Sequence, residues 1–423
     1  MACAIGFAEF GHTVVGYDIL PERIRLLQRG MTPYREAGIA EALARHLSED
    51  RASFVDDFDK AVAGADFIII AVGTPSLGDG KADLSAVDSV VAHLSSMHLD
   101  GATVVLRSTV PPGTSDRVAA ALRGKADVVY APEFLREGSA VADFLSPDRV
   151  VAGAENAVAG RRYCELFAHL NRPMLVMSLI DAELVKAASN AFLAMKISFA
   201  NQVANLCDGL EADALEVLGA VGHDRRIGGM FLQPGIGFGG PCFEKDLKSL
   251  IHVMNTANTN ASLLEATLEI NDKQPRRIVE TIKDELGDDL SNLKFGVWGL
   301  TFKGGTNDLR DSLALRVVDE IMASGGQGVA YDPSYRDGAT ESQRFELAES
   351  ALAAADADVL VVLTDWPQFA KIDEHAIAAR VRRRLVIDGR NVLDASALRN
   401  AGMTYRGIGR RRTVDSLELA ETG

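Results

Sequence analysis

The stretch Gly235–Asp246, GIGFGGPCFEKD, decides how the rest of the chain is interpreted. Its four glycines predict a backbone that turns tightly or lets a ligand approach closely. Pro241 suits the first position of a helix, so Cys242 is expected in the first turn of a helix that continues through KDLKSLIHVM. A helix N-terminus favours the thiolate, and Asp246 follows four residues later on the same face. The pattern predicts a nucleophile beside an acid or base, although a glycine-rich turn before a buried cysteine explains these residues equally well.

Length and composition describe an ordinary globular protein with about three domains. The chain has 423 residues, of which 47% are hydrophobic and 24% are charged. A net charge of −15 argues against nucleic acid or an anionic membrane as a partner. The four cysteines show no CxxC spacing, which predicts neither a metal site nor a disulfide framework. The start lacks a basic leader, and no run of about 18 apolar residues occurs, so we expect a cytoplasmic protein without a membrane span.

Continuous apolar segments alternate with helical patterns in the first part of the chain. The predicted strands are VVGY, ADFIIIAV, TVVLRST, ADVVYAPE, RVVAGA and PMLVM. Strands that are apolar on both faces are typical of a parallel sheet covered by helices. We therefore predict a doubly wound domain over residues 1–178.

The middle and last parts of the chain differ in pattern. Leu179–Leu210 is one helical pattern without proline, and residues 179–288 are expected to be an all-helical domain. Strand patterns return in residues 289–423, where GVAYDPSY resembles the earlier VVGYDILP and DADVLVVLTDWP resembles GADFIIIAVGTP. These paired echoes predict an α/β fold in which two doubly wound, Rossmann-like domains are joined by an all-helical domain with a long central helix.

The repeat indicates that the first copy lacks its opening strand. In the second copy a strand begins at Lys294, 38 positions before Asp332, whereas only 17 residues precede Asp18. The missing part is where a Gly-x-Gly-x-x-Gly dinucleotide loop would lie, with Asp18 on the ribose hydroxyls. We hypothesise that the native protein begins upstream of Met1, which the mass of the protein from its source would test.

Two pairs of polar residues stand four positions apart. Glu133 and Glu137 follow an apolar strand, and they can share a helical face at the carboxyl end of the sheet or belong to a solvated helical turn. Lys186 and Asn190 lie on the long predicted helix. A half-buried lysine there would bind an oxyanion, whereas a surface lysine is the commoner case.

Basic residues occur at two further places. Arg225 and Arg226 precede the cysteine stretch and are candidates for phosphate or sugar hydroxyls. Lys303 and Arg310 lie after the first strand of the last domain and before a helix, where phosphate groups bind readily. Together the residues predict two nucleotide-binding domains with a reactive thiol between them in the sequence.

The chain resembles the UDP-glucose/GDP-mannose dehydrogenase family. The matching stretches are GHTVVGYD, AVGTP, RSTVPPGT, APEFLREG, ELVKAASNAF, RIGGMFLQPGIGFGGPCFEKD, LTFKGGTNDLRDS and DGRNVLD, in family order from Gly11 to Asp394. The resemblance implies a four-electron oxidation of a nucleotide sugar at C6, with NAD as the acceptor, in which a cysteine forms a thiohemiacetal and then a thioester.

The resemblance also implies roles for individual residues. Cys242 is the nucleophile, and Lys186 with Asp246 flanks the reacting oxygen and water. Asn190 holds the oxyanion, while Glu133 is the base for the hydrolytic water and has Thr109 beside it. The residues implied for NAD are Asp18, Thr74, Thr109, Glu137 and Arg310. Those implied for the nucleotide sugar are Phe134, Leu135, Lys186, Asn190, Arg226, Phe231, Leu232, Gly239, Lys303 and Arg390, with Arg226 reaching across a homodimer interface built on the long helix.

Two departures from the family pattern leave alternatives open. The glycine-rich cofactor loop is absent from residues 1–423, and Glu244 stands where relatives often carry proline or glutamine. RIGGMFLQ with CFEKD favours UDP-glucose over GDP-mannose and UDP-N-acetylmannosamine as the substrate. The other hypotheses are a non-catalytic nucleotide-sugar-binding protein and a hydroxyacid dehydrogenase, although the latter needs neither the cysteine stretch nor a third domain.

Overall fold

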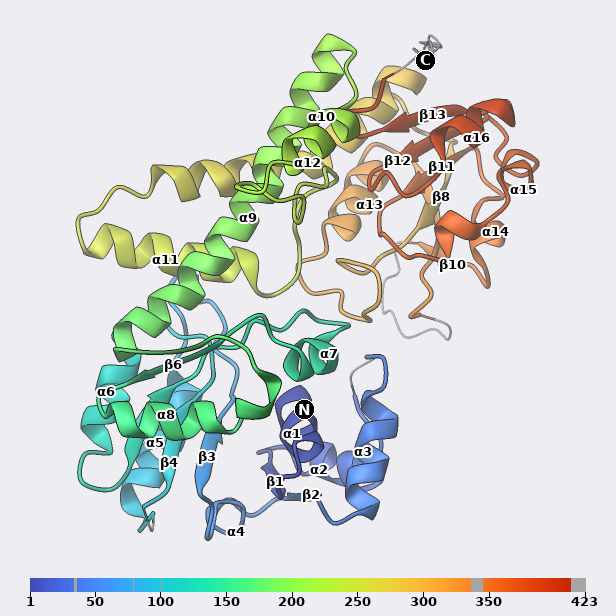
Figure 1. Cartoon of the computed structure of the whole chain (residues 1–423). Coiled ribbons are helices and arrows are strands. Elements are labelled where there is room, and N and C mark those ends of the chain that lie inside the picture. Colours follow the sequence, from blue (N-terminus) through green and yellow to red (C-terminus); the bar gives the residue numbers. More distant parts are fainter. Residues whose placement is uncertain (34–35, 79, 100, 336–344, 412–423) are drawn as a thin grey trace, which may run out of the picture. The chain divides into compact units, whose positions relative to one another are not determined.

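The computed structural model describes residues 1–33, 36–78, 80–99, 101–335 and 345–411. The chain forms two compact units, coloured along the sequence in Figure 1. Unit 1 comprises Met1–Ala191 and Lys245–Ala261, and unit 2 comprises Phe192–Glu244 and Ser262–Gly423. Two helices, α9 (Leu179–Leu210) and α11 (Phe243–Thr256), begin in one unit and end in the other.

Unit 1 is an α/β structure built on short, largely apolar strands. Its strands are β1 (Val14–Tyr17), β2 (Ala52–Val55), β3 (Phe67–Ile70), β4 (Thr103–Leu106), β5 (Asp127–Tyr130), β6 (Val150–Ala154) and β7 (Met174–Met177). Its helices, besides the two shared ones, are α1 (Ala2–Glu9), α2 (Pro21–Gln28), α3 (Ile39–Ser48), α4 (Phe58–Val62), α5 (Ser85–Ser96), α6 (Thr114–Ala121), α7 (Ala140–Leu145), α8 (Ala157–Glu165) and the 3₁₀ turn η1 (Ala168–Leu170).

The strands of unit 1 fall into two sheets. β1 pairs in parallel with β2, and a second sheet has the order β3-β4-β5-β6-β7. In the described part of the chain no strand joins β1 to β3. The apolar strand patterns predicted a parallel sheet. The second sheet departs from this prediction, because β6 runs antiparallel to β5. Parallel neighbours need a connection that crosses over the sheet, and the segment from β5 to β6 does not provide one. The helix in that segment, α7, packs on α1 instead, and its Phe144 ring fills the space beside Gly6.

Unit 2 contains a second doubly wound structure and the helices that precede it. Its strands are β8 (Lys294–Trp298), β9 (Gln327–Tyr331), β10 (Glu346–Leu347), β11 (Val359–Val362), β12 (Leu385–Asp388) and β13 (Thr404–Gly407). Its helices are α10 (Ala214–Gly222), α12 (Ser262–Leu286), α13 (Leu313–Ala323), α14 (Ala351–Ala354), η2 (Phe369–Lys371), α15 (Glu374–Ala378) and α16 (Ala395–Asn400).

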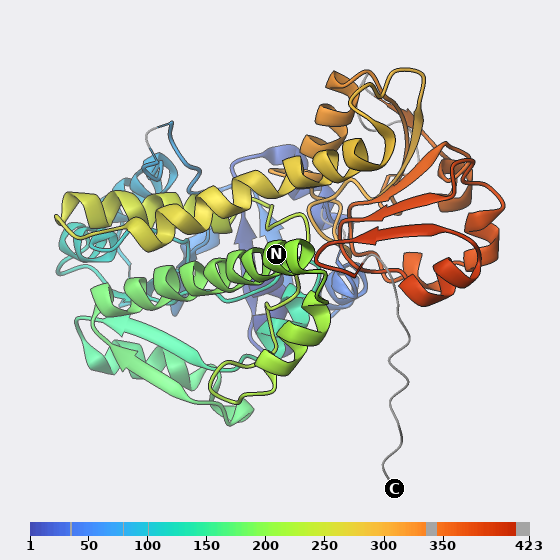
Figure 2. The same cartoon turned by 90° about the horizontal axis from the view of Figure 1, so that it is seen from above.

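The sheet of unit 2 is continuous and parallel, with the order β10-β9-β8-β11-β12-β13. β8 therefore stands between β9 and β11, the two strands whose sequences echo β1 and β3 of unit 1. Every residue of β11 and β12 is buried, because helices cover both faces of the sheet. Figure 2 shows α12 running beside α9, and the Ser198 hydroxyl donates to the Thr267 carbonyl between them, 2.8 Å away. The fold class predicted from the sequence is confirmed.

Candidate active site

A partly buried ion pair in unit 1 joins the long helix to the loop after β5. The Lys186 ammonium on α9 donates to Oε1 of Glu133 at 3.0 Å and to the Glu133 backbone carbonyl at 2.6 Å. The lysine side chain is only 6% exposed, so it is more deeply buried than the half-buried position considered from the sequence. A lysine held inside in this way is a fixed positive charge rather than a mobile surface group.

The surroundings of Glu133 favour its ionised form. Burial raises the pKa of its carboxyl, but the Lys186 ammonium and the Leu135 N–H, which donates to Oε2 at 2.7 Å, outweigh burial, so the pKa lies below its ordinary value. Glu133 and Glu137 do not share a helical face, as had been considered, because residues 131–139 form a loop and α7 begins only at Ala140. The turn at Glu133, closed by its own carboxylate on Leu135, replaces the expected helix.

A second buried pair lies on the same face of α9, one turn further along. The Asn190 amide donates to Oδ2 of Asp246 at 2.6 Å, and the Lys245 ammonium donates to the other carboxylate oxygen, also at 2.6 Å. Asp246 and Asn190 are 5% and 7% exposed, which leaves these hydrogen bonds shielded from water. The carboxylate of Asp246 is thus oriented by two donors from different elements, α9 and α11.

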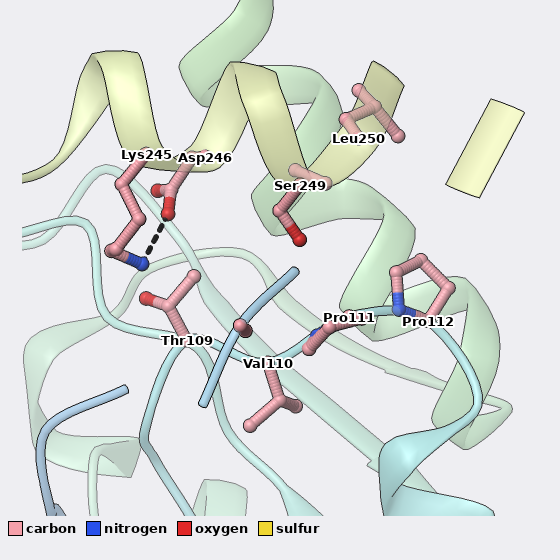
Figure 3. Close-up of a pocket in the computed structure, with 10 residues that line it drawn as sticks. Thr109, Val110, Pro111, Pro112, Lys245, Asp246, Ser249 and Leu250 are labelled. Carbon is pink, nitrogen blue, oxygen red and sulfur yellow. Dashed lines mark hydrogen bonds and ion pairs between the residues drawn. The ribbon is translucent and has the colours of Figure 1, made fainter. Parts of the chain in front are cut away.

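Of these residues, Lys245 and Asp246 border a pocket of unit 1, drawn in Figure 3. Its lining residues are Ala82, Thr109, Val110, Pro111, Pro112, Ala187, Lys245, Asp246, Ser249 and Leu250. Thr109 follows β4, and its carbonyl accepts from the Thr74 hydroxyl at 2.6 Å. The pocket therefore brings the predicted Thr109 together with Asp246 at the carboxyl end of the sheet, where ligands bind in doubly wound folds.

Apart from Lys186 and Asn190, which lie on α9, the residues of unit 1 that the resemblance assigns to NAD and sugar lie after strand ends. Asp18 follows β1; it accepts from the Leu20 N–H at 3.0 Å and pairs with Arg23 at 2.6 Å. A carboxylate in that place retains lone pairs that can accept from ribose hydroxyls, so the acceptor on the ribose side fits NAD. Glu137 is half-buried in the loop 131–139. The ring of Phe134 in that loop lies 3.9 Å from the Arg149 guanidinium and 5.5 Å from the Lys186 ammonium.

The cysteine stretch belongs to unit 2 up to Glu244. Cys242 is an exposed thiol, which excludes the interpretation of a buried cysteine. The prediction that Cys242 lies in the first turn of a helix is wrong. The residue precedes α11, because the helix starts at Phe243 and residues 241 and 242 form a turn. The residue just before a helix still faces the unsatisfied N–H groups of its first turn.

Two glycines of this stretch are required by close contacts. Gly237 has φ +102°, and a Cβ there would lie 2.5 Å from Oδ1 of Asn271. A Cβ on Gly239 would lie 2.5 Å from the Asp311 carbonyl. The sequence prediction of a backbone in close approach is therefore correct, although the neighbour in unit 2 is protein rather than ligand.

Arg390 follows β12 and is enclosed by backbone carbonyls. Its guanidinium donates to the carbonyls of Leu363 at 3.1 Å, Gly237 at 3.0 Å and Phe302 at 3.1 Å. Burial lowers the pKa of Arg390 and outweighs the effects of neighbouring acids. Lys303 lies beside Phe302, with its ammonium 5.7 Å from the ring.

The other residues predicted in unit 2 differ widely in exposure. Leu232 is buried at 4% exposure, and Phe231 has φ +65° with its ring 6.4 Å from that of Phe243. The Arg226 side chain is 89% exposed and forms a bidentate pair with Asp224. Arg310 is 68% exposed and pairs with Asp308.

Sequence reasoning missed three residues of these clusters. Lys245 holds Asp246, and its place inside the motif CFEKD was the only available signal. Asn201 and Asn271 hydrogen-bond the backbone of the cysteine stretch. An asparagine on an amphipathic helix is usually solvated, so nothing in the sequence marked either of them.

Comparisons with family models account for most of the chain. The NAD binding domain model of the UDP-glucose/GDP-mannose dehydrogenase family matches residues 1–171, the central domain model residues 180–273, and the UDP binding domain model residues 296–395. Two nucleotide-binding domains and a cysteine between them in sequence define the class of NAD-dependent nucleotide-sugar dehydrogenases. The chain belongs to the UDP-glucose/GDP-mannose dehydrogenase family.

Individual relatives cover nearly the whole length. The chain is 38% identical to UDP-glucose 6-dehydrogenase of Rhizobium meliloti (strain 1021), over 97% of both chains. Among solved structures it is similar to a UDP-glucose dehydrogenase from Pyrobaculum islandicum, with a TM-score of 0.89, 38% identity and 97% and 95% of the two chains covered. A UDP-D-ManNAc dehydrogenase from Pyrococcus horikoshii gives a TM-score of 0.84 at 28% identity, over 97% of both chains.

Within the described ranges, none of the helices has the length and apolar character needed to cross a bilayer.

Proposed function

We propose that this protein oxidises the C6 alcohol of UDP-glucose to the carboxylic acid, giving UDP-glucuronate. The observation that carries this substrate is the 38% identity to the UDP-glucose 6-dehydrogenase of Rhizobium meliloti over 97% of both chains. The structural relative named for UDP-glucose shares 38% of its residues with this chain, against 28% for the one named for UDP-D-ManNAc. Substrate specificity is therefore assigned to the glucose nucleotide.

The nucleotide part is assigned to unit 2 and the cofactor to unit 1. Lys303, after β8, supplies a cation for the diphosphate, and Phe231, Leu232 and Gly239 with Arg390 shape the sugar side. Asp18, Thr74, Thr109 and Glu137 hold NAD, with Arg310 as a further contact. NAD supplies the hydride acceptor for both oxidation steps.

The first oxidation needs a base for the O6 proton and donors for the oxygen. We assign the proton to Asp246, whose carboxylate is oriented by Asn190 and Lys245. C6 loses a hydride and O6 gives its proton to Asp246, which produces an aldehyde. Lys186 supplies the positive charge beside the developing oxyanion.

The second oxidation uses the thiol. Hydride does not leave an aldehyde carbon directly to give an acid, so the Cys242 thiolate adds to C6 and forms a thiohemiacetal whose oxyanion is held by Asn190 and Lys186. Loss of a second hydride from C6 leaves a thioester on Cys242. The exposed thiol just before α11 suits this step, because the N–H groups of a helix start favour thiolate.

Hydrolysis then releases the acid. Glu133 accepts a proton from water, the resulting hydroxide adds to the thioester carbon, and the Cys242 thiolate leaves. The lowered pKa of Glu133 keeps its carboxylate ready to accept that proton at neutral pH. The ammonium of Lys186 contacts this carboxylate and balances its negative charge before the proton transfer.

We also propose a homodimer built on α9. Phe192, Phe199 and Leu206 are 58%, 49% and 61% exposed and are spaced seven residues apart, so they form one apolar stripe along the helix. The outward-pointing Arg226 is assigned to the substrate of the second copy. A cytoplasmic location is assigned because catalysis needs Cys242 as a thiol, which a reducing compartment preserves.

The test is the stoichiometry of NADH formed by purified protein from limiting UDP-glucose. Two NADH for each sugar are expected, because both oxidations take place on one molecule. One NADH per sugar, or turnover only with GDP-mannose or UDP-N-acetylmannosamine, would contradict the proposal. Binding of UDP-glucose in calorimetry without any NADH would instead indicate a nucleotide-sugar-binding protein.

A further inference from the structure

Three side chains hold the backbone of the cysteine stretch at successive points. Oδ1 of Asn201, on α9, accepts from the Gly235 N–H at 2.8 Å, and Arg390 donates to the Gly237 carbonyl at 3.0 Å. Asn271, on α12, contacts Phe238 twice: Oδ1 accepts from its N–H at 2.7 Å and the amide donates to its carbonyl at 2.9 Å. All of these residues belong to unit 2.

The two asparagines are built into rigid surroundings. Asn201 is 0% exposed and Asn271 is 3% exposed, so water cannot replace their hydrogen bonds. Their helices run side by side and are joined by the buried bond from Ser198 to the Thr267 carbonyl. Each amide orientation is fixed by its partner, because a backbone N–H requires the oxygen and a carbonyl requires the nitrogen.

The loop is shaped to fit Asn271. Gly237 adopts φ +102°, and any Cβ at that position would collide with the Asn271 oxygen at 2.5 Å and with a methyl group of Leu313 at 2.8 Å. The absence of a side chain at residue 237 therefore lets the carboxamide approach the backbone of the next residue. Gly237 and Asn271 thus act together as one structural device.

A path of direct contacts leads from this device to the thiol. The ring of Phe238 packs edge-on against that of Phe243, with centroids 5.7 Å apart and an interplanar angle of 88°. Phe243 is the first residue of α11 and the neighbour of Cys242. Holding the backbone of Phe238 limits where its ring can lie, and the ring in turn limits where Phe243 and Cys242 can lie.

We propose that Asn271 and Asn201 are positioning residues for Cys242, an inference that rests on the nucleophilic role proposed for that thiol. Asn271 uses both its oxygen and its nitrogen, whereas the contact of Asn201 with the loop uses its oxygen alone. Covalent catalysis depends on the sulfur lying within attacking distance of C6, and small misplacements are costly. The device acts through the loop and touches neither substrate nor cofactor.

This difference gives a matched pair of variants. Asn201→Asp and Asn271→Asp place the same carboxyl group at two equally buried sites, so their general effects on folding are alike. Asn201→Asp keeps the acceptor for Gly235, and its kcat at saturating UDP-glucose and NAD is expected within about twofold of the unmodified protein. Asn271→Asp loses the donor and sets an oxygen against the Phe238 carbonyl, so kcat is expected to fall on the order of 10-fold to 100-fold.

Asn201→Leu supplies a second comparison that does not depend on residue 271. It removes the acceptor for Gly235, and its kcat is expected well below that of Asn201→Asp, with rescue by the aspartate. Equal loss of kcat in the two aspartate variants, or equal kcat in Asn201→Leu and Asn201→Asp, would overturn the proposal. Circular dichroism and the melting temperature confirm that the compared proteins are folded.

Hydrogen exchange of the loop separates this proposal from the proposed function. Read by NMR or by mass spectrometry, the Phe238 amide is expected to lose protection in Asn271→Asp, and the Gly235 amide in Asn201→Leu but not in Asn201→Asp. These changes need no turnover, so they are measurable even if UDP-glucose is not the substrate. Unchanged protection of both amides would show that the asparagines do not hold the loop.

Discussion

At the residue scale, the site in unit 1 is organised by one buried lysine, Lys186. Lys186 binds Glu133 through both the side chain and the backbone, and this double contact fixes the loop after β5 as well as the charge of the carboxylate. The sequence placed Lys186 on a helix beside small residues but gave no partner. Glu133 is distant in sequence, and only the packing of α9 against the sheet reveals that the two meet.

Replacing this lysine should change the pH dependence of the reaction. In the protein as it stands, the depressed pKa of Glu133 means that the carboxylate, and the stability it contributes, is present above the ordinary value of 4.5 and is lost as the pH falls through the depressed value. Lys186→Met removes the ammonium, so the pKa of Glu133 rises and the acidic limb of the kcat profile moves to higher pH.

The measurement is kcat against pH for both proteins, with Lys196→Met as the control, because within the described residues the Lys196 ammonium donates to the backbone carbonyls of Ile227 and Gly228 and not to a carboxylate. An acidic limb that stays in place in Lys186→Met would show that Glu133 does not limit the rate there. A shift of equal size in the control would point to a general effect of lost charge.

Cys242 is the second residue whose replacement is informative. Cys242→Ser retains an exposed hydroxyl before α11 but loses the acidity of the thiol, so formation of the acid is expected to fall on the order of 10³-fold or more. Product analysis by mass spectrometry measures the acid directly. Cys207→Ser, which alters a buried cysteine, is the control and should retain kcat within a few-fold.

At the element scale, α9 does most to organise the chain. Its span, Leu179–Leu210, agrees with the sequence prediction, because a proline-free run with apolar residues at helical spacing leaves few alternatives. The loop 131–139 was harder to predict, since Glu133 and Glu137 fit a helical face until a side chain closes a local turn. β2, β10 and β13 were missed because ASFV, EL and TYRG are short and only partly apolar.

The apolar stripe on α9 predicts a dimer that a single charge can break. Phe199→Glu places a carboxylate in the middle of Phe192, Phe199 and Leu206, and burial of that charge in an interface is costly. Light scattering after gel filtration is expected to give the mass of two chains for the unmodified protein and of one chain for the variant. Val158→Glu, at a residue 61% exposed on α8, is the control and should leave the mass unchanged. A dimer that persists in Phe199→Glu would place the interface elsewhere.

At the scale of the whole molecule, two Rossmann-like structures were predictable and their division into units was not. Apolar strand patterns, repeated in the same order, carried the fold class. The compact units divide the helical middle, since Phe192–Glu244 and Ser262–Leu286 belong to unit 2 and Lys245–Ala261 to unit 1, and the domain bounds expected at residues 178 and 288 stay a prediction. That division depends on which surfaces the helices bury, and the helical pattern of a sequence does not contain it.

Binding of UDP is expected to change hydrogen exchange in unit 2 and not in unit 1. The family's UDP binding domain model covers residues 296–395, which include the loops after β8 and β12. Saturating UDP is expected to slow hydrogen exchange around Lys303 and Arg390, and at a free concentration 100-fold above Kd it adds about 2.7 kcal/mol to the stability of the binding region. Protection confined to the strands of unit 1 would place the nucleotide in the wrong unit. Glucose 1-phosphate, which lacks the nucleoside, serves as the control ligand.

The divided sheet of unit 1 has a consequence for handling the protein. Among the described residues, β1 pairs only with β2, and β3 pairs only with β4, so each has a row of backbone donors and acceptors without a strand beside it. Val15 and Tyr17 on β1 are 42% and 39% exposed, which adds apolar surface to an adhesive border. Such borders recruit extended segments of other molecules and can seed fibrous deposits. Dilute, cold storage and brief concentration steps suit a chain with such open strand edges.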